Sequence, residues 1–179
     1  MQVFQPPHLF APLFSALRVS QRHAASAIFR TAWATATTSV DLSRTYLAWA
    51  QRNLALNRLS GAAHRFVRAD CREWLQAASP AEASFDLVFL APPTFSNSKR
   101  MEGVLDVARD HPPLIDACVR LLAPGGLLVF SSNAQRFRLA GELTERYSVL
   151  DISAATLPED FARNPRIHRC YEIRAQGSH

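Results

Sequence analysis

The sequence predicts an α/β domain built on a doubly wound, mostly parallel sheet. Short apolar runs alternate with helix-length segments along most of the chain, as expected for strands joined by crossover helices. The run Leu87–Leu90 ends at Pro92 and Pro93, neither of which can donate a hydrogen bond to a strand ladder. A second apolar run, Leu127–Ser131, follows a Pro-Gly-Gly turn. Both runs are typical of buried strands that lead into loops.

Length and composition allow one such domain. The chain has 179 residues, of which 48% are hydrophobic and 20% charged, which indicates a globular protein too short for two domains of ordinary size. No apolar run approaches the roughly 18 residues of a membrane span. The three cysteines form no CxxC pair, so we expect no metal site and a reducing cytoplasm.

The charge balance permits a nucleic-acid partner. The formal net charge is +5, and Lys99 is the only lysine among the 20 basic residues. Arginine binds phosphates with two parallel hydrogen bonds and stacks on bases, which favours an RNA partner. Genome composition explains the same arginine bias equally well.

Residues 1–38 differ from the rest because they contain no Asp, Glu or Gly. After a cluster of prolines, the apolar spacing predicts an amphipathic helix. The positions on its apolar face are Phe14, Leu17, Ala24, Ala25, Ile28 and Ala32. The same composition is typical of an organelle transit peptide, which is the alternative interpretation.

The segment 37–42 is rich in β-branched residues and predicts a strand that ends at Asp41. In nucleoside-binding α/β folds, an acid at the end of the second strand accepts hydrogen bonds from the ribose hydroxyls. Asp41, beside Leu42, is therefore a candidate cofactor ligand. The alternative is a helix-start acid, since Ser43 is a good N-cap for the helix predicted over 44–57.

The next two elements repeat this pattern. Residues 63–69 alternate apolar and basic side chains, as a half-exposed strand does, and Asp70 then stands where it would cap the next helix. Further on, Pro112 and Pro113 suit the first turn of a helix. Its apolar stripe predicts core positions at Leu114, Ile115, Cys118, Leu121 and Leu122.

The C-terminal part predicts two strands over 147–152 and 167–173, which form a closing antiparallel hairpin. The loop between them is basic, with Arg163, Arg166, His168 and Arg169 near the second strand. This loop either contacts RNA or is a solvated edge of the sheet.

The loop that follows Leu90 is the predicted site. In open α/β sheets, ligands bind beyond the carboxyl ends of the strands, so this loop lies at the edge of the site. It supplies polar donors and two positive charges, which are Thr94, Ser96, Asn97, Ser98, Lys99 and Arg100.

The run APPTFSNSKR, followed by RDHPPLI and LLAPGGLLVFSSN, resembles the C-terminal, guanine-N7-methylating half of the bifunctional 23S rRNA methyltransferases. The resemblance covers roughly residues 36–174. It implies a Rossmann-like class I methyltransferase with an antiparallel C-terminal strand, S-adenosyl-L-methionine as cofactor, and 23S rRNA as partner in the cytoplasm. It also implies two parts of the chain: an atypical segment 1–35 and a methyltransferase-like domain 36–179.

The resemblance also implies roles for individual residues. The cofactor would contact Phe14, Ser15, Asp41, Leu42, Asp70, Cys71 and Ala91, with Asp70 and Cys71 flanking the adenine. The catalytic loop would comprise Ala91, Pro92, Pro93, Phe95 and Asn97, with Phe95 stacking on an extruded base. The RNA-binding positions would be Ser96, Ser98, Lys99, Arg100 and Arg109.

Two departures from the family pattern bear on activity. The family has Asp-Pro-Pro where this chain has Ala91-Pro92-Pro93, and the glycine-containing first loop is replaced by Leu13–Arg18. Glycines in that loop let the backbone approach the cofactor without a Cβ in the way. We therefore expect impaired activity, or alternatively a catalytically inactive remnant that acts as an RNA-binding module.

The first 35 residues fit a replaced or out-of-frame start on a truncated gene. The family's upstream RNA-binding and second methyltransferase regions have no counterpart in the sequence. A nicotinamide dehydrogenase is a more distant interpretation, because the GxGxxG fingerprint is absent.

Overall fold

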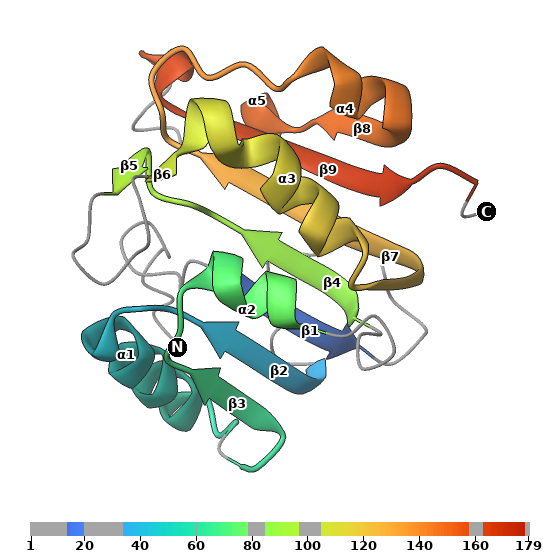
Figure 1. The fold of residues 1–179 in the computed structure, drawn as a ribbon. Helices are drawn as coiled ribbons and strands as arrows, with labels where there is room; N and C mark the ends of the chain where they lie inside the picture. The colour runs from blue at the N-terminus through green and yellow to red at the C-terminus, as the bar shows by residue number, and fades with distance from the viewer. Residues whose placement is uncertain are drawn as a thin grey trace.

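The structure is a computed structural model that describes residues 14–19, 34–59, 61–78, 85–96, 105–157 and 163–177. Its centre is a seven-stranded sheet in the order β3-β2-β1-β4-β7-β9-β8 (Figure 1). The strands are β1 (Phe14–Val19), β2 (Ala34–Val40), β3 (His64–Val67), β4 (Phe85–Leu90), β7 (Leu122–Ser132), β8 (Tyr147–Asp151) and β9 (Arg169–Ala175). The β2–β3 and β4–β7 pairs are parallel, whereas β9 is antiparallel to both β7 and β8. The predicted α/β class and the antiparallel C-terminal strand are confirmed. The sheet is mixed rather than mostly parallel, because β1 is also antiparallel to both of its neighbours, β2 and β4.

Helices lie between the strands from β2 onwards, and a two-stranded ribbon of β5 and β6 lies outside the main sheet. The remaining elements are α1 (Arg44–Leu56), α2 (Cys71–Ala77), β5 (Phe95–Ser96), β6 (Leu105–Asp106), α3 (Val107–Val119), α4 (Gly141–Arg146), α5 (Ser153–Thr156) and the 3-10 helix η5 (Pro165–Ile167). The hydroxyl of Ser43 caps α1 by accepting from the Tyr46 N–H at 3.3 Å, as the sequence predicted. Helices α2 and α3 cover the same face of the sheet (Figure 1).

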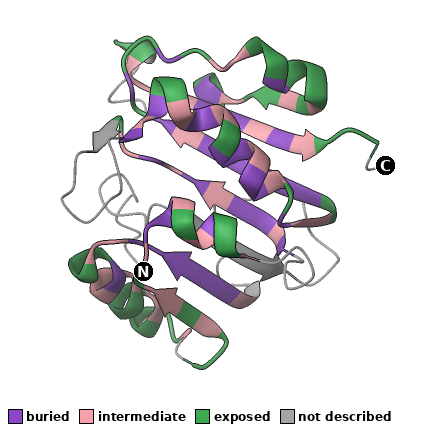
Figure 2. Cartoon of the chain, in the orientation of Figure 1, coloured by how far each residue is buried: buried purple, intermediate pink, exposed green. Residues whose placement is uncertain are grey.

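The two central strands β4 and β7 are buried on both faces. Val88 and Phe130 pack into the cluster that also contains the apolar stripe of α3, while Leu87 and Val129 pack on the opposite face. Figure 2 shows this burial running along the middle of the sheet. Strands that are covered on both faces require continuous apolar runs rather than alternating apolar and polar residues.

The strand β1 corrects the prediction of a helix at the start of the chain. Residues 14–19 are extended and lie between β2 and β4, antiparallel to both, with Phe14 opposite Val40 and Leu90. The other predicted helix positions, 24, 25, 28 and 32, lie outside the described residues. Without β1, the backbone groups of β2 and β4 that face each other would be buried without hydrogen-bond partners. A strand between them pairs with both.

The start of α3 also differs from the prediction. Asp106 caps the helix by accepting from the Ala108 N–H at 3.0 Å, and its own N–H donates to Asp110 at 2.9 Å. This reciprocal capping starts the helix at Val107, so Pro112 and Pro113 lie in its second turn rather than its first. The prediction failed because the strong cap lies five residues earlier than the prolines suggested.

The predicted turn before β7 is confirmed, although β7 begins earlier, at Leu122. A shift in the register of β4 against β7, between Phe85 and Leu87, accommodates the extra residues. Gly125 has φ +75°, and a Cβ on Gly126 would lie 2.9 Å from the carbonyl oxygens of Ala123 and Phe85. Only glycine fits both positions without strain. Among the described helices, none is long and apolar enough to cross a membrane.

Candidate functional site

The carboxyl ends of β2, β3 and β4 meet at one edge of the sheet. Val40 is opposite Val67, and Leu90 is opposite Phe130, so Asp41 and Ala91 each come one residue after a paired strand end. Phe14 pairs with both Val40 and Leu90, which puts the first residue of β1 at the same edge. The architecture therefore brings together the backbone of most predicted cofactor positions.

Asp41 is buried, with 5% of its surface exposed. Its Oδ1 accepts from the Ser43 N–H at 2.6 Å, and its own N–H donates to the Val67 carbonyl at 3.1 Å. The local role at the start of α1 is thus confirmed, and the ribose role stays a prediction. Leu42 beside it is half-buried, and its carbonyl accepts from Arg68.

Asp70 is also buried, with 3% of its surface exposed, and caps α2. Its Oδ1 accepts from the Arg72 N–H, and the Arg72 guanidinium contacts its Oδ2, both at 2.9 Å. The hydrogen bond to this carboxylate raises the pKa of Arg72. The predicted N-cap role is confirmed, and the contact with adenine stays a prediction.

Cys71 follows Asp70 directly and belongs to the buried apolar core. It is 1% exposed, and burial, followed by the charge of Asp70, raises the pKa of its thiol to about 12. The side chain therefore stays protonated and behaves as a small apolar group rather than as a nucleophile.

The loop after β4 begins with a buried proline. Pro92 is buried, Ala91 and Pro93 are half-buried, and Thr94 is exposed. The Val107 N–H donates to the Thr94 carbonyl at 3.3 Å, and Phe95 pairs with Asp106, so the base of the loop is tied to the start of α3. The side chains of Phe95 and Ser96, and all of Asn97, Ser98, Lys99 and Arg100, lie outside the described residues.

Arg109 lies in the first turn of α3, near the base of that loop. Its side chain is 67% exposed and its guanidinium contacts Asp110 at 2.6 Å. This hydrogen bond lowers the pKa of the Asp110 carboxyl. Arg109 is thus accessible, as an RNA-binding role requires, but part of its charge is balanced by its neighbour.

The direction of β1 was not predicted. Val19, its last residue, is opposite Ala34 at the other edge of the sheet, so the chain that follows β1 leaves from the edge remote from Asp41. Ser15 lies one residue inside the sheet, opposite Ser39 and Phe89. The sequence predicted the loss of the glycine loop, but an apolar strand pattern does not encode strand direction.

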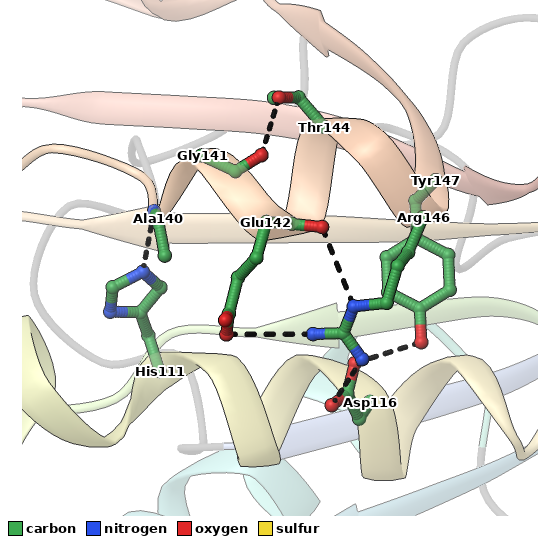
Figure 3. A network of polar contacts seen from close by, with 8 residues as sticks. All are labelled: His111, Asp116, Ala140, Gly141, Glu142, Thr144, Arg146 and Tyr147. Carbon is green, nitrogen blue, oxygen red and sulfur yellow. Dashed lines mark hydrogen bonds and ion pairs between the residues drawn. The ribbon is translucent and has the colours of Figure 1, made fainter.

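His111 is a structural residue that the sequence analysis missed. It is 2% exposed, its Nδ1 lies 2.9 Å from the Val107 carbonyl, and its Nε2 lies 3.0 Å from the Ala140 backbone nitrogen (Figure 3). Because the Ala140 N–H donates, Nε2 must accept and the ring proton must be on Nδ1. Burial lowers the pKa of His111. The ring therefore holds the loop after β7 against α3.

A second contact between α3 and α4 involves Asp116. Its Oδ2 lies 2.8 Å from Arg146, and its Oδ1 accepts from the Tyr147 hydroxyl at 2.8 Å (Figure 3). Arg146 is 44% exposed, so the ion pair adds little stability by itself. Its role is to orient α4 and β8 against α3. No group of His, Cys, Asp and Glu in the described part of the chain is arranged to hold a metal ion.

Comparison with known proteins gives matches of three kinds. The family model described as "Methyltransferase domain" matches residues 22–130. The chain is 58% identical over 141 residues to the ribosomal RNA large subunit methyltransferase K/L of Hahella chejuensis, covering 79% of this chain and 19% of that protein. It is 56% identical over 140 residues to the protein of the same name from Allochromatium vinosum, with 78% and 19% covered. The chain thus spans about a fifth of the length of these relatives.

Among solved structures, the fold resembles that of SMU.776 complexed with SAH. The TM-score is 0.64 and the sequence identity 24%, over 79% of this chain and 40% of that chain. A SAM-dependent methyltransferase structure from Streptococcus mutans is similar at a TM-score of 0.60 and 23% identity, over 79% of this chain and 39% of the other. At such identities the likeness concerns the fold alone.

Proposed function

This chain belongs to the methyltransferase domain family, and we propose that it is an S-adenosyl-L-methionine-dependent domain that methylates guanine N7 in 23S rRNA. One observation carries the proposal: Asp41 and Asp70 are buried acids that follow the ends of two neighbouring parallel strands. The names of the longer relatives describe them as ribosomal RNA methyltransferases, which supports the choice of substrate.

The nucleoside end of the cofactor fits this pair of acids. Ribose presents hydroxyl donors and adenine an amino group, and carboxylates only accept hydrogen bonds at neutral pH. Asp41 would take the ribose hydroxyls and Asp70 the adenine amine, while Leu42 and Cys71 supply apolar contacts. The bound cofactor supplies the methyl group.

The methionine end fits less well. Phe14 is the residue of β1 at this edge, and Ser15 is already inside the sheet, so β1 offers no loop of backbone N–H groups there. We therefore propose that Phe14, Ser15 and Ala91 mark where the methionine part would lie, without assigning them hydrogen bonds to it.

Guanine N7 already holds a lone pair, so the reaction needs orientation and exclusion of water rather than a strong base. The Ala91-Pro92-Pro93 turn would orient the base, because two prolines restrict the backbone and Pro92 is anchored in the interior. In our proposal Phe95 stacks on the extruded guanine, Asn97 reads its edge, and Ser96, Ser98, Lys99, Arg100 and Arg109 contact the RNA.

The inactive, RNA-binding remnant is the second candidate, and the reversed β1 favours it. A reversed first strand removes the usual cofactor loop from the carboxyl edge of the sheet. The side chain of Ala91 also offers no acceptor for the protons on guanine N1 and N2, and loss of one polar contact costs on the order of 1–3 kcal/mol, or about 10–100-fold.

The first test is calorimetric titration of the purified chain with S-adenosylhomocysteine. We expect micromolar binding, weakened about 10–100-fold by Asp41→Ala because hydrogen bonds to charged groups are lost. Asp151→Ala is the matched control, since Asp151 also ends a strand at this edge and accepts from the N–H two residues later, at 2.8 Å. Absence of binding by the folded chain would refute the cofactor role.

The second test measures transfer of a labelled methyl group to 23S rRNA. Ala91→Asp restores the acid of the family pattern, so we expect it to raise the methylation rate about 10–100-fold. If neither form methylates rRNA although both bind S-adenosylhomocysteine, the methyltransferase activity is refuted, and RNA binding without cofactor then tests the alternative.

A further inference from the structure

We propose that five arginines on the loop after β7 and on the segment that leads into β9 form a phosphate-binding surface for RNA, distinct from the loop after β4. They are Arg136, Arg138, Arg163, Arg166 and Arg169. The choice of RNA as partner rests on the proposed function, whereas the location of the surface rests on the structure.

The two segments lie together at the carboxyl edge of the sheet. Ser132, the last residue of β7, is opposite Arg169, the first residue of β9. His168 joins them further, because its Nδ1 lies 3.3 Å from Asn133 Oδ1 and its Nε2 lies 2.9 Å from Thr156 Oγ1. The pairing and these side-chain contacts bring the arginines of both segments to one side of the molecule.

The loop after β7 is built to present its arginines. Phe137 is 3% exposed and packs edge-on against His111, with ring centroids 4.8 Å apart. Arg136 and Arg138 on either side of it are exposed. The buried ring anchors the loop, and the His111–Ala140 hydrogen bond fixes its far end. The loop therefore projects two guanidinium groups from a rigid base.

The segments that carry these arginines contain no acidic residue of their own. Residues 131–140 and 163–169 contain no Asp or Glu. In the described part of the chain, none of the five arginines forms an ion pair. Asp151, at the end of β8, is a carboxylate that acts on His168; it accepts from the Ser153 N–H and hydroxyl and forms no ion pair with these arginines in the described part of the chain. Residues 158–162, which include Glu159 and Asp160, lie outside the described residues and form no part of the proposal.

The backbone of Arg136 allows a matched control. Its φ is +61°, a conformation that costs an L-residue roughly 1–2 kcal/mol and favours glycine. Arg58 has nearly the same φ, +60°, but lies at the C-terminal end of α1, on the opposite edge of the sheet.

These two arginines make a matched pair of variants. Arg136→Gly and Arg58→Gly remove the same charge from the same backbone conformation, and both should relieve strain rather than unfold the protein. Binding is measured by fluorescence anisotropy with a labelled RNA stem-loop, without cofactor, between about 50 and 200 mM salt. Chemical denaturation of each variant checks that the fold is intact.

We expect Arg136→Gly to weaken RNA binding about fivefold at 0.1 M salt. The slope of the logarithm of the association constant against the logarithm of the salt concentration should become shallower by about 0.7, which corresponds to the loss of one phosphate contact. Arg138→Gln and Arg166→Gln should act similarly, and Arg58→Gly should change neither quantity. Equal losses for Arg136→Gly and Arg58→Gly, or no loss for either, would overturn the surface.

The outcomes separate this surface from the proposed function. If S-adenosylhomocysteine does not bind but Arg136→Gly still weakens RNA binding, the cofactor role fails and the surface stands. If the chain methylates rRNA and Arg136→Gly leaves RNA binding unchanged, the surface fails and the methyltransferase function stands.

Discussion

Replacement of His111 tests whether one buried ring joins α3 to the loop after β7. His111→Leu removes the acceptor for the Ala140 N–H and the edge contact with Phe137. An unsatisfied donor costs about 1–3 kcal/mol and an aromatic pair about 0.5–1.5 kcal/mol, and the apolar surface of leucine offsets part of this loss. We expect a net loss of about 2 kcal/mol at pH 7.5, or about 4–8 °C in Tm.

The same residue predicts a pH dependence. In the unfolded chain the pKa of His111 is near its ordinary value of about 6.5, and in the fold burial lowers that pKa. Between the two values the unfolded chain binds more protons. The unfolding free energy should therefore fall as the pH drops through about 6.5, by at most about 1.4 kcal/mol per pH unit, and level off below the folded-state pKa.

His111→Gln separates the two effects, because a side-chain carbonyl still accepts from the Ala140 N–H but does not titrate. It should retain more stability than His111→Leu and lose the part of the pH slope that His111 causes. The carboxylates of Asp110 and Glu142 oppose the effect of burial on the pKa of His111. Burial and Arg169 also lower the pKa of His168, so His168→Gln is measured alongside as the control for that slope.

The assay is urea denaturation between pH 5 and 8, followed by tryptophan fluorescence. A loss below about 0.5 kcal/mol for His111→Leu at pH 7.5, which is the range of ordinary surface substitutions, would refute the bridging role. A pH slope that is as steep in His111→Gln as in the unchanged chain would show that other groups cause it.

Three further predictions concern stability and reactivity. Gly126→Ala brings a Cβ within 2.9 Å of two backbone carbonyl oxygens and should lower the unfolding free energy by about 1–3 kcal/mol. Gly141→Ala is the control, because nothing lies within 4 Å of its Cβ, and it should change the unfolding free energy little. Equal effects of the two substitutions would contradict the steric argument. Asp70→Asn keeps a good N-cap but loses the ion pair with Arg72, whereas Asp70→Ala loses both. In denaturation experiments, Asp70→Ala should therefore lower the unfolding free energy by about 1 kcal/mol more than Asp70→Asn does. The thiols of Cys71, Cys118 and Cys170 are buried with raised pKa, so none should react with a thiol reagent at pH 7.5 in the folded chain, and rapid reaction of any of them would contradict their burial.

The sequence alone predicted the parts of this protein that depend on local patterns. The strand ending at Leu90, the caps at Ser43 and Asp70 and the Pro-Gly-Gly turn each follow from residues a few positions apart. Their physical causes are local hydrogen bonds and backbone sterics, so they are visible without a fold. The family pattern around Pro92 and Pro93 indicated a candidate site in the loop after β4, and this stays a prediction.

The tertiary structure decided the features that depend on distant partners. The reversal of β1 follows from pairing with two strands that come later in the chain, and an apolar strand pattern reads the same in either direction. The bridge from His111 to Ala140, 29 residues away, and the contact of Asn133 with His168, in the segment before β9, arise only when the sheet is complete. Local sequence specifies which elements form, whereas strand direction and long-range side-chain contacts are set by the packing that satisfies all of their backbone groups at once.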